Sequence, residues 1–243
     1  MSRCLNIMYF IIFLITGCYS KAEVKNRNGI FTDSAFEEVV TRALDMNAED
    51  IRLEDLETIT KLGFSNPNLF WIIKNIEGIQ YMKNLKYLMI FDTKISDITP
   101  ISGLTHIENL CLTGNSIEDI EPIGNLVKIK YLNISYNFIK DLSPIYSLID
   151  LEKINASRNK IDKIPDLSLC NKLIHINIIS NEISDGTPLV KAINLSEIYL
   201  ESNLIEDYEW IFELNELMNL DVGRNPVKNK EKLLKSHIKI WFD

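Results

Sequence analysis

The sequence is poor in the residues and motifs that most enzymes and metal sites need. It has 243 residues but only 3 His and 4 Cys. It contains no G-x-x-x-x-G-K-[ST], G-x-S-x-G, H-E-x-x-H or C-x-x-C motif. His106, His175 and His237 stand at unrelated places, and no Asp-rich loop fits a calcium site. We therefore predict a protein that is not an enzyme and that binds neither a cofactor nor a metal.

Basic segments are also absent. The 26 Lys and Arg residues are outnumbered by 34 Asp and Glu residues, which gives a net charge of −8. No run of Lys and Arg is long enough to follow a phosphate backbone, so we expect no binding to nucleic acid. Because 46% of the residues are hydrophobic, the chain can still bury a sizeable core.

The N-terminal segment differs from the rest of the chain. A short apolar run, "LNIMYFIIFLI", begins at Leu5, shortly after Arg3, and is too short to span a bilayer comfortably. The sequence "ITGC" then resembles the bacterial lipobox. The resemblance implies a lipoprotein signal peptide over residues 1–17, acylation of Cys18 and a linker over residues 18–30. An ordinary cleaved signal and a retained membrane anchor stay open as alternatives.

From Leu85 onward the sequence repeats every 22 residues without insertion or deletion. The fourth and sixth places of each block are apolar and alternate with polar neighbours, which predicts one short strand with one buried face. The ninth place holds Asn, whose inward amide can satisfy backbone groups where the strand ends. This predicted ladder comprises Asn115, Asn137, Asn159, Asn181, Asn203 and Asn225.

The second half of each block predicts a return turn on the opposite side. Thr99-Pro100, Ser143-Pro144 and Thr187-Pro188 place a hydroxyl before proline, so we expect these hydroxyls to cap short helical turns. The recurrent Asp residues nearby indicate turn chemistry. Since no single block can bury its apolar face, neighbouring blocks must stack into one parallel sheet.

The blocks read L-x-x-L-x-L-x-x-N-x-I-x-D-I-x-P-I-x-x-L, which resembles the leucine-rich repeat and, in its 22-residue form, the bacterial internalin family. The resemblance implies a leucine-rich-repeat horseshoe: an α/β solenoid with a concave parallel sheet and short convex 3-10 or helical turns. We expect a helical N-terminal cap over residues 31–72, repeats over 73–225 and a helical C-terminal cap over 226–243.

Several blocks depart from the pattern. Thr93 replaces the ladder Asn, Lys163 and Pro165 disturb the fourth turn, Gly186 replaces an apolar residue, and Trp210 replaces proline. Two cysteines of the repeats, Cys111 and Cys170, fall in different blocks on different faces. We therefore predict that they form no disulfide.

The third, fifth and seventh places of each block should face the concave side. Aromatic and Met side chains gather there in the first blocks, and charged ones in the last blocks. Such exposed aromatic residues are enriched where proteins bind, although strands also favour them for their own sake. We predict binding by Tyr87, Met89, Phe91, Tyr131, Tyr136, His175, Glu197, Tyr199 and Glu201.

Two functions fit this surface. A surface lipoprotein, anchored in a membrane through Cys18, would bind a protein or glycan outside the cell, and the family resemblance implies a host factor. Alternatively, a periplasmic or envelope scaffold would bind a partner of its own cell. In either case we expect an exported, monomeric protein with an unidentified protein ligand.

Overall fold

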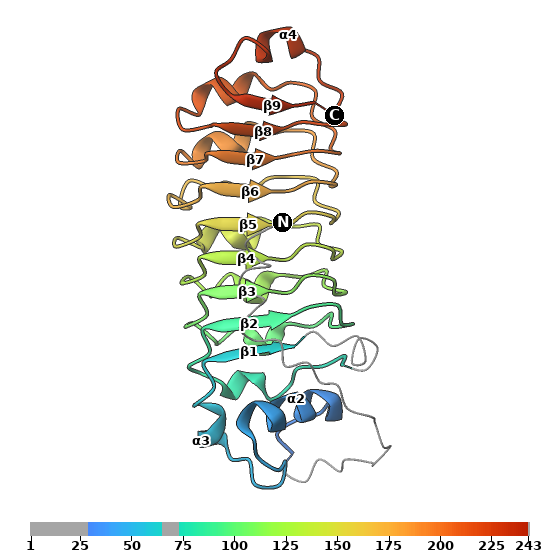
Figure 1. Cartoon of the computed structure of the whole chain (residues 1–243), viewed down its shortest axis with the longest axis vertical. Coiled ribbons are helices and arrows are strands. Elements are labelled where there is room, and N and C mark those ends of the chain that lie inside the picture. Colours follow the sequence, from blue (N-terminus) through green and yellow to red (C-terminus); the bar gives the residue numbers. More distant parts are fainter. Residues whose placement is uncertain (1–28, 65–72, 243) are drawn as a thin grey trace.

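The computed structural model describes residues 29–64 and 73–242. Each 22-residue block contributes one short strand because its inward apolar residues alternate with polar ones. Nine strands form one sheet in chain order, and every neighbouring pair is parallel (Figure 1). They are β1 (Lys61–Phe64), β2 (Tyr87–Ile90), β3 (Asn109–Cys111), β4 (Tyr131–Asn133), β5 (Lys153–Asn155), β6 (His175–Asn177), β7 (Glu197–Tyr199), β8 (Asn219–Asp221) and β9 (Lys239–Trp241).

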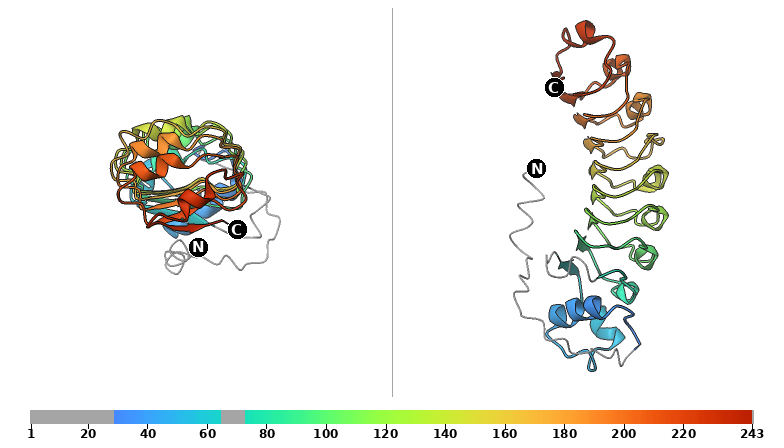
Figure 2. Two further views of the ribbon diagram at one scale, coloured as in Figure 1. Left: turned by 90° about the horizontal axis from the view of Figure 1, so that it is seen from above. Right: turned by 90° about the vertical axis from the view of Figure 1, so that its right-hand side faces the viewer.

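The return turns lie on the other side of the stack from the sheet, and the sheet side is gently concave (Figure 2). Six of these turns are 3-10 helices: η1 (Ile79–Tyr81), η2 (Thr99–Ile101), η3 (Glu121–Ile123), η4 (Ser143–Ser147), η5 (Thr187–Lys191) and η6 (Glu209–Glu213). Between sheet and turns runs one continuous core, in which the Leu and Ile side chains of all blocks are almost wholly buried. The predicted solenoid fold is confirmed.

The cap of the 3-10 turns differs from the prediction. The hydroxyls of Thr99, Ser143 and Thr187 do not cap these turns. Instead, the Asp two residues earlier accepts the backbone N–H, as Asp97 does from Thr99 at 2.8 Å. A carboxylate accepts this bond more strongly than a hydroxyl because it carries a full charge. The row of Asp residues therefore has the turn chemistry expected of it.

The fourth turn contains no 3-10 helix. Pro165 stands one place earlier than proline does in the other blocks, whereas the Asp turn lies three places later than in them. The carboxylate of Asp166 accepts from Ser168 N at 2.8 Å, and this bond lowers the pKa of Asp166. Lys163 and Pro165 thus alter the local turn without interrupting the stack, because Leu167 and Cys170 still fill the core.

Helices cover the N-terminal end. Helix α2 (Ser34–Leu44) packs Phe36, Val39 and Val40 into the core, and α3 (Leu53–Leu56) adds Leu56. Asp33 fixes this cap to the first repeat. One carboxylate oxygen accepts from Ala35 N and Phe36 N, and the other accepts from Lys74 N at 2.9 Å.

The sheet extends further at both ends than the 22-residue period predicts. Strand β1 lies inside the segment expected to form only the cap, since Leu62 and Phe64 alternate into the core. At the other end the expected C-terminal helix is wrong. Only α4 (Lys230–Leu233) is helical, and β9 follows it because Ile238 and Ile240 turn toward the core.

Candidate functional site

The candidate site is the concave face of the sheet. The strand register aligns the third and fifth places of successive blocks into two continuous columns, such as Tyr87↔Asn109 and Met89↔Cys111. The seventh places follow directly after the strands. Because the fourth and sixth places fill the core, these three columns carry the side chains that can meet a partner.

An aromatic group lies on the first strands. Lys61 of β1 places its Nζ 4.9 Å from the ring centre of Tyr87. Beside it Gly63 leaves room for Met89, whose Cε would lie 3.3 Å from a β-carbon there. Tyr87, Met89 and Phe91 are half-buried rather than fully exposed. Contacts with β1 therefore orient Tyr87 and Met89 before any partner arrives.

Two further tyrosines stand nearer the middle of the sheet. Tyr131 on β4 is 40% exposed and Tyr136 is 54% exposed. Tyr136 lies at the strand-exit edge, where its backbone is left-handed with φ of 57°. Arg158 of the next block lies over its ring at 5.0 Å. The strand β3 separates Tyr131 from the group formed by Tyr87, Met89 and Phe91.

A charged group lies on β6, β7 and the start of the following loops. His175 Nδ1 is 2.9 Å from Glu197 Oε2, and Tyr199 OH donates to the same oxygen at 3.4 Å. The rings of His175 and Tyr199 are 5.2 Å apart. Burial, together with the Glu197 charge, raises the pKa of Tyr199. Glu201 forms a separate ion pair with Arg224 at 3.4 Å.

The predicted ladder lies directly behind this face. The side-chain NH2 of Asn137 donates to the carbonyl oxygens of Leu112, Ile134 and Ser135, and its oxygen accepts from Ile117 N at 3.0 Å. The same pattern recurs at Asn159, Asn181, Asn203 and Asn225. Asn115 also donates to strand carbonyls, but its oxygen accepts the Thr93 hydroxyl. These bonds hold the strand ends in fixed register.

Comparison with known proteins identifies the repeat. Residues 83–125 and 127–169 match the family described as Leucine Rich repeats (2 copies). Internalin C2 of Listeria monocytogenes is 29% identical, with a TM-score of 0.81 over 93% of this chain and 100% of that one. This chain is an internalin-like bacterial leucine-rich-repeat protein.

More distant structures agree on the fold. Internalin F of Listeria monocytogenes is 24% identical, with a TM-score of 0.51 over 88% of this chain and 76% of that one. A leucine-rich-repeat protein of Leptospira interrogans is 23% identical, with a TM-score of 0.70 over 79% of this chain and 51% of that one. No curated protein sequence matches the chain. Internalin-like solenoids of this kind typically serve as scaffolds for protein–protein interaction.

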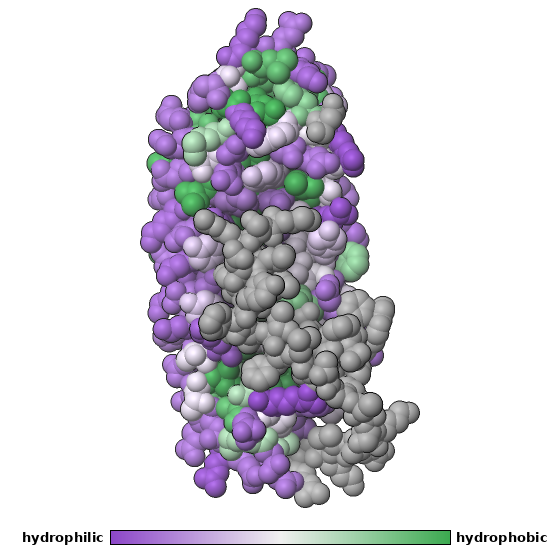
Figure 3. Space-filling view, in the orientation of Figure 1, coloured by the Kyte–Doolittle hydropathy of each residue, from purple (hydrophilic) through white to green (hydrophobic). Residues whose placement is uncertain are grey.

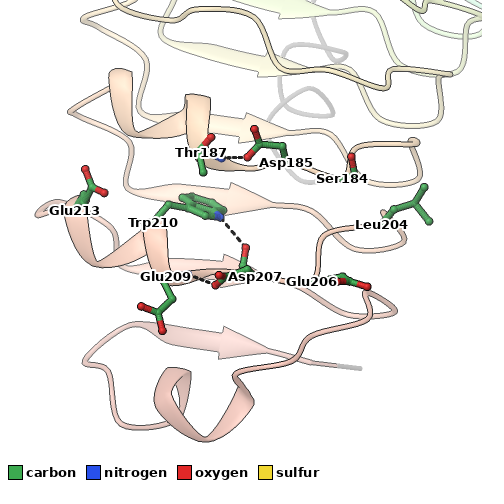
Figure 4. Close-up of a pocket in the computed structure, with 9 residues that line it drawn as sticks. All are labelled: Ser184, Asp185, Thr187, Leu204, Glu206, Asp207, Glu209, Trp210 and Glu213. Atoms are coloured by element: carbon green, nitrogen blue, oxygen red, sulfur yellow. Dashed lines mark hydrogen bonds between the residues drawn. The ribbon is translucent and has the colours of Figure 1, made fainter.

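The internalin-like protein also has a hollow away from the concave face (Figure 4). Its lining comprises Ser184, Asp185, Thr187, Leu204, Glu206, Asp207, Glu209, Trp210 and Glu213. Glu206 and Glu209 pair with Lys228 and Lys232, while Asp185 and Asp207 hold the turns. Within the described ranges no group of three or more His, Cys, Asp or Glu residues is arranged to hold a metal.

Cys111 lies on β3, Cys170 is buried in the core, and no disulfide joins them, as predicted. Burial raises the pKa of the Cys170 thiol to about 11. The predicted lipidation site, Cys18, lies outside the described residues. Among the described residues, every helix is too short or too polar to span a bilayer.

Sequence reasoning missed two parts of this face. Lys61 and Gly63 belong to a strand that lies 26 residues, not 22, before its partner β2. Trp241 belongs to β9, which follows β8 by only 20 residues, and Lys239 covers its ring at 4.6 Å. The sequence signal that could have predicted β1 was the alternation of apolar Leu62 and Phe64 with Lys61 and Gly63.

Proposed function

We propose that this protein is an exported lipoprotein, held to a membrane through Cys18, and that its concave face binds a protein partner outside the cell. The observation that carries the binding proposal is the aromatic group on β2. Tyr87, Met89 and Phe91 place apolar side chains on the concave face, where they do not fill the core. Such clusters are typical of binding surfaces.

The contacts around this group support the proposal. Lys61 lies over the Tyr87 ring and Met89 lies close against Gly63 before binding, so less side-chain entropy is lost when a partner covers them. Tyr131 and Tyr136 continue the surface toward the middle of the sheet with much exposed ring area. His175, Glu197, Tyr199 and Glu201 would add selectivity through charge, since rim charges affect partner choice more than affinity.

The polarity of the surface and the net charge bear on the kind of partner that fits. Figure 3 shows the sheet side, on which hydrophilic side chains predominate among the coloured residues and hydrophobic ones gather near α4 and β9. A protein with a net charge of −8 repels acidic partners at long range, so a neutral or basic partner fits better. The protein is expected to act as a monomer.

The binding site can be tested by capture of a partner with the solenoid as bait. The double variant Tyr87→Ala, Phe91→Ala should weaken binding at least tenfold, about 1.4 kcal/mol, because it removes both aromatic anchors. Lys128→Ala is the matched control, since this exposed side chain lies on a turn away from the sheet. Loss of binding in the control with retention in the double variant would place the site elsewhere.

The anchor needs its own test. Cys18→Ala should remain unacylated and should be released largely from the membrane fraction, because a lipid chain on Cys18 supplies the membrane affinity. Fatty-acid labelling of wild type and variant measures this directly, and unlabelled wild-type protein would contradict the anchor. Protease treatment of intact cells then distinguishes a partner outside the cell from one within the envelope.

A further inference from the structure

Three asparagines form a second row of amides, separate from the buried ladder. Asn133, Asn155 and Asn177 occupy the fifth place of β4, β5 and β6 and are register partners. Each side-chain oxygen accepts the backbone N–H two residues further on, at 3.1, 3.0 and 3.1 Å. A backbone N–H can only donate, so the oxygen must face it and the NH2 group must turn away.

The NH2 groups of this row lack partners within the described residues, whereas the ladder amides donate to carbonyl oxygens. The side chains are half-buried, so water reaches them only in part. Neighbouring parallel strands lie about 4.8 Å apart, and the row therefore presents one neutral donor group at each such step. Hydrogen-bond donors that have no acceptor on a rigid surface can bind a ligand that supplies one.

The fold does not require Asn at this place. Met89, Cys111 and Tyr199 occupy it in other blocks, and those blocks form the same strands. The row is also bordered by suitable side chains. Tyr131 stands beside its first member with 40% of its surface exposed, and Tyr199 follows its last member on β7.

The spacing separates two classes of ligand. Along an extended peptide, carbonyl groups on one side recur every two residues, about 6.8 Å, and fall out of step with the row. In a linear polysaccharide of the cellulose or chitin type alternate rings are turned over, but each edge still presents a hydroxyl oxygen at every ring, at a spacing close to that of the strands. Its rings also offer apolar C–H faces that stack on tyrosine. Uncharged donors match uncharged hydroxyl acceptors.

We propose that Asn133, Asn155 and Asn177 bind an extended polysaccharide of this type, with one sugar ring at each repeat. Tyr131 and Tyr199 stack on the rings at the two ends of the row. The asparagine row is distinct from the group of Tyr87, Met89 and Phe91 that carries the proposed protein binding, although Tyr131 and Tyr199 belong to both surfaces. Its test uses glycans alone, so either proposal can fail while the other stands.

The test follows the side-chain amide signals of the 15N-labelled full chain by NMR. Cellohexaose and chitohexaose are added at millimolar concentration, with the curled maltohexaose as geometric control. We expect at least one of the two extended glycans to shift the signals of Asn133, Asn155 and Asn177. The buried amides of Asn137 and Asn159 should stay in place because their NH2 groups are already bonded.

Variants complete the test. Asn155→Ala should weaken glycan binding at least tenfold, while Asn125→Ala on an exposed turn should bind as wild type. The proposal is overturned if neither extended glycan moves the three signals, if maltohexaose moves them equally, or if Asn155→Ala binds normally. If Asn155→Ala does not fold, the shifts of the wild-type amide signals with the three glycans still test the proposal.

Discussion

Substitution of one ladder amide should reveal how much these bonds stabilise the stack. In Asn137→Ala three carbonyl oxygens lose one donor each. Leu112 O still accepts from Asn115, Ile134 O from Asn159, and Ser135 O from Gly114 N. Only the N–H of Ile117 loses the partner that Asn137 supplied. One buried unpaired donor costs about 1–3 kcal/mol, so we expect a destabilisation of about 2 kcal/mol.

The assay is urea unfolding followed by circular dichroism, with Lys140→Ala as the control. Lys140 lies three residues away on the same turn but is exposed, so its removal should change the free energy of unfolding by less than about 0.5 kcal/mol. Equal losses in the two variants would refute the argument that the inward amide, rather than the turn, provides the stability.

A third variant distinguishes the contribution of the Asn137 side-chain oxygen from that of its NH2 group. Asn137→Asp keeps an oxygen for the N–H of Ile117 but directs a carboxylate toward three carbonyl oxygens. It should therefore be less stable than Asn137→Ala at neutral pH and should recover as acid protonates it. Identical behaviour of both variants at all pH values would show that the NH2 bonds contribute nothing.

Two further predictions concern departures from the regular pattern. Glu37 is 1% exposed with no hydrogen-bond partner for either carboxylate oxygen, and desolvation raises its pKa above 4.5. Stability should then fall as pH rises from 4.5 through the raised pKa, and Glu37→Gln should remove that fall; a pH profile unchanged by the substitution contradicts this. At Gly186 a β-carbon would lie 2.4 Å from Trp210 Cζ2, so Gly186→Ala should cost about 1–3 kcal/mol. Combining it with Trp210→Leu should restore part of the loss in thermal unfolding, and strict additivity would exclude the contact.

The regular part of the fold was predictable because one physical constraint recurs in every block. Leu132 and Ile134 must face inward and Asn137 must meet the carbonyls at the strand end, so a fixed spacing follows. The two end strands of the sheet, β1 and β9, could not be predicted in this way. No neighbour constrains the outer edges of β1 and β9 to a 22-residue step, and alternation of buried residues was the only signal left.

Local chemistry within the repeat was harder to predict. The eighth place is left-handed in every full block, and Gly114 suits that conformation, but Tyr136 gives no sign of it in the sequence. Thr93 likewise serves in the ladder, where its hydroxyl bonds to Asn115 and lies 3.4 Å from Ile95 N. In both cases the neighbouring repeats impose the conformation, which no property of the single residue reveals.

The two rows of asparagine show most clearly why the concave site was only partly predictable. Asn133 and Asn137 are the same residue type four positions apart. At the ninth place the backbone offers carbonyl oxygens, so the NH2 of Asn137 is consumed by the fold. At the fifth place the backbone offers an N–H, so the oxygen of Asn133 accepts from it and the NH2 group points away from the backbone. The function of each amide therefore depends on which backbone group lies within its reach, and that is set by strand geometry rather than by composition.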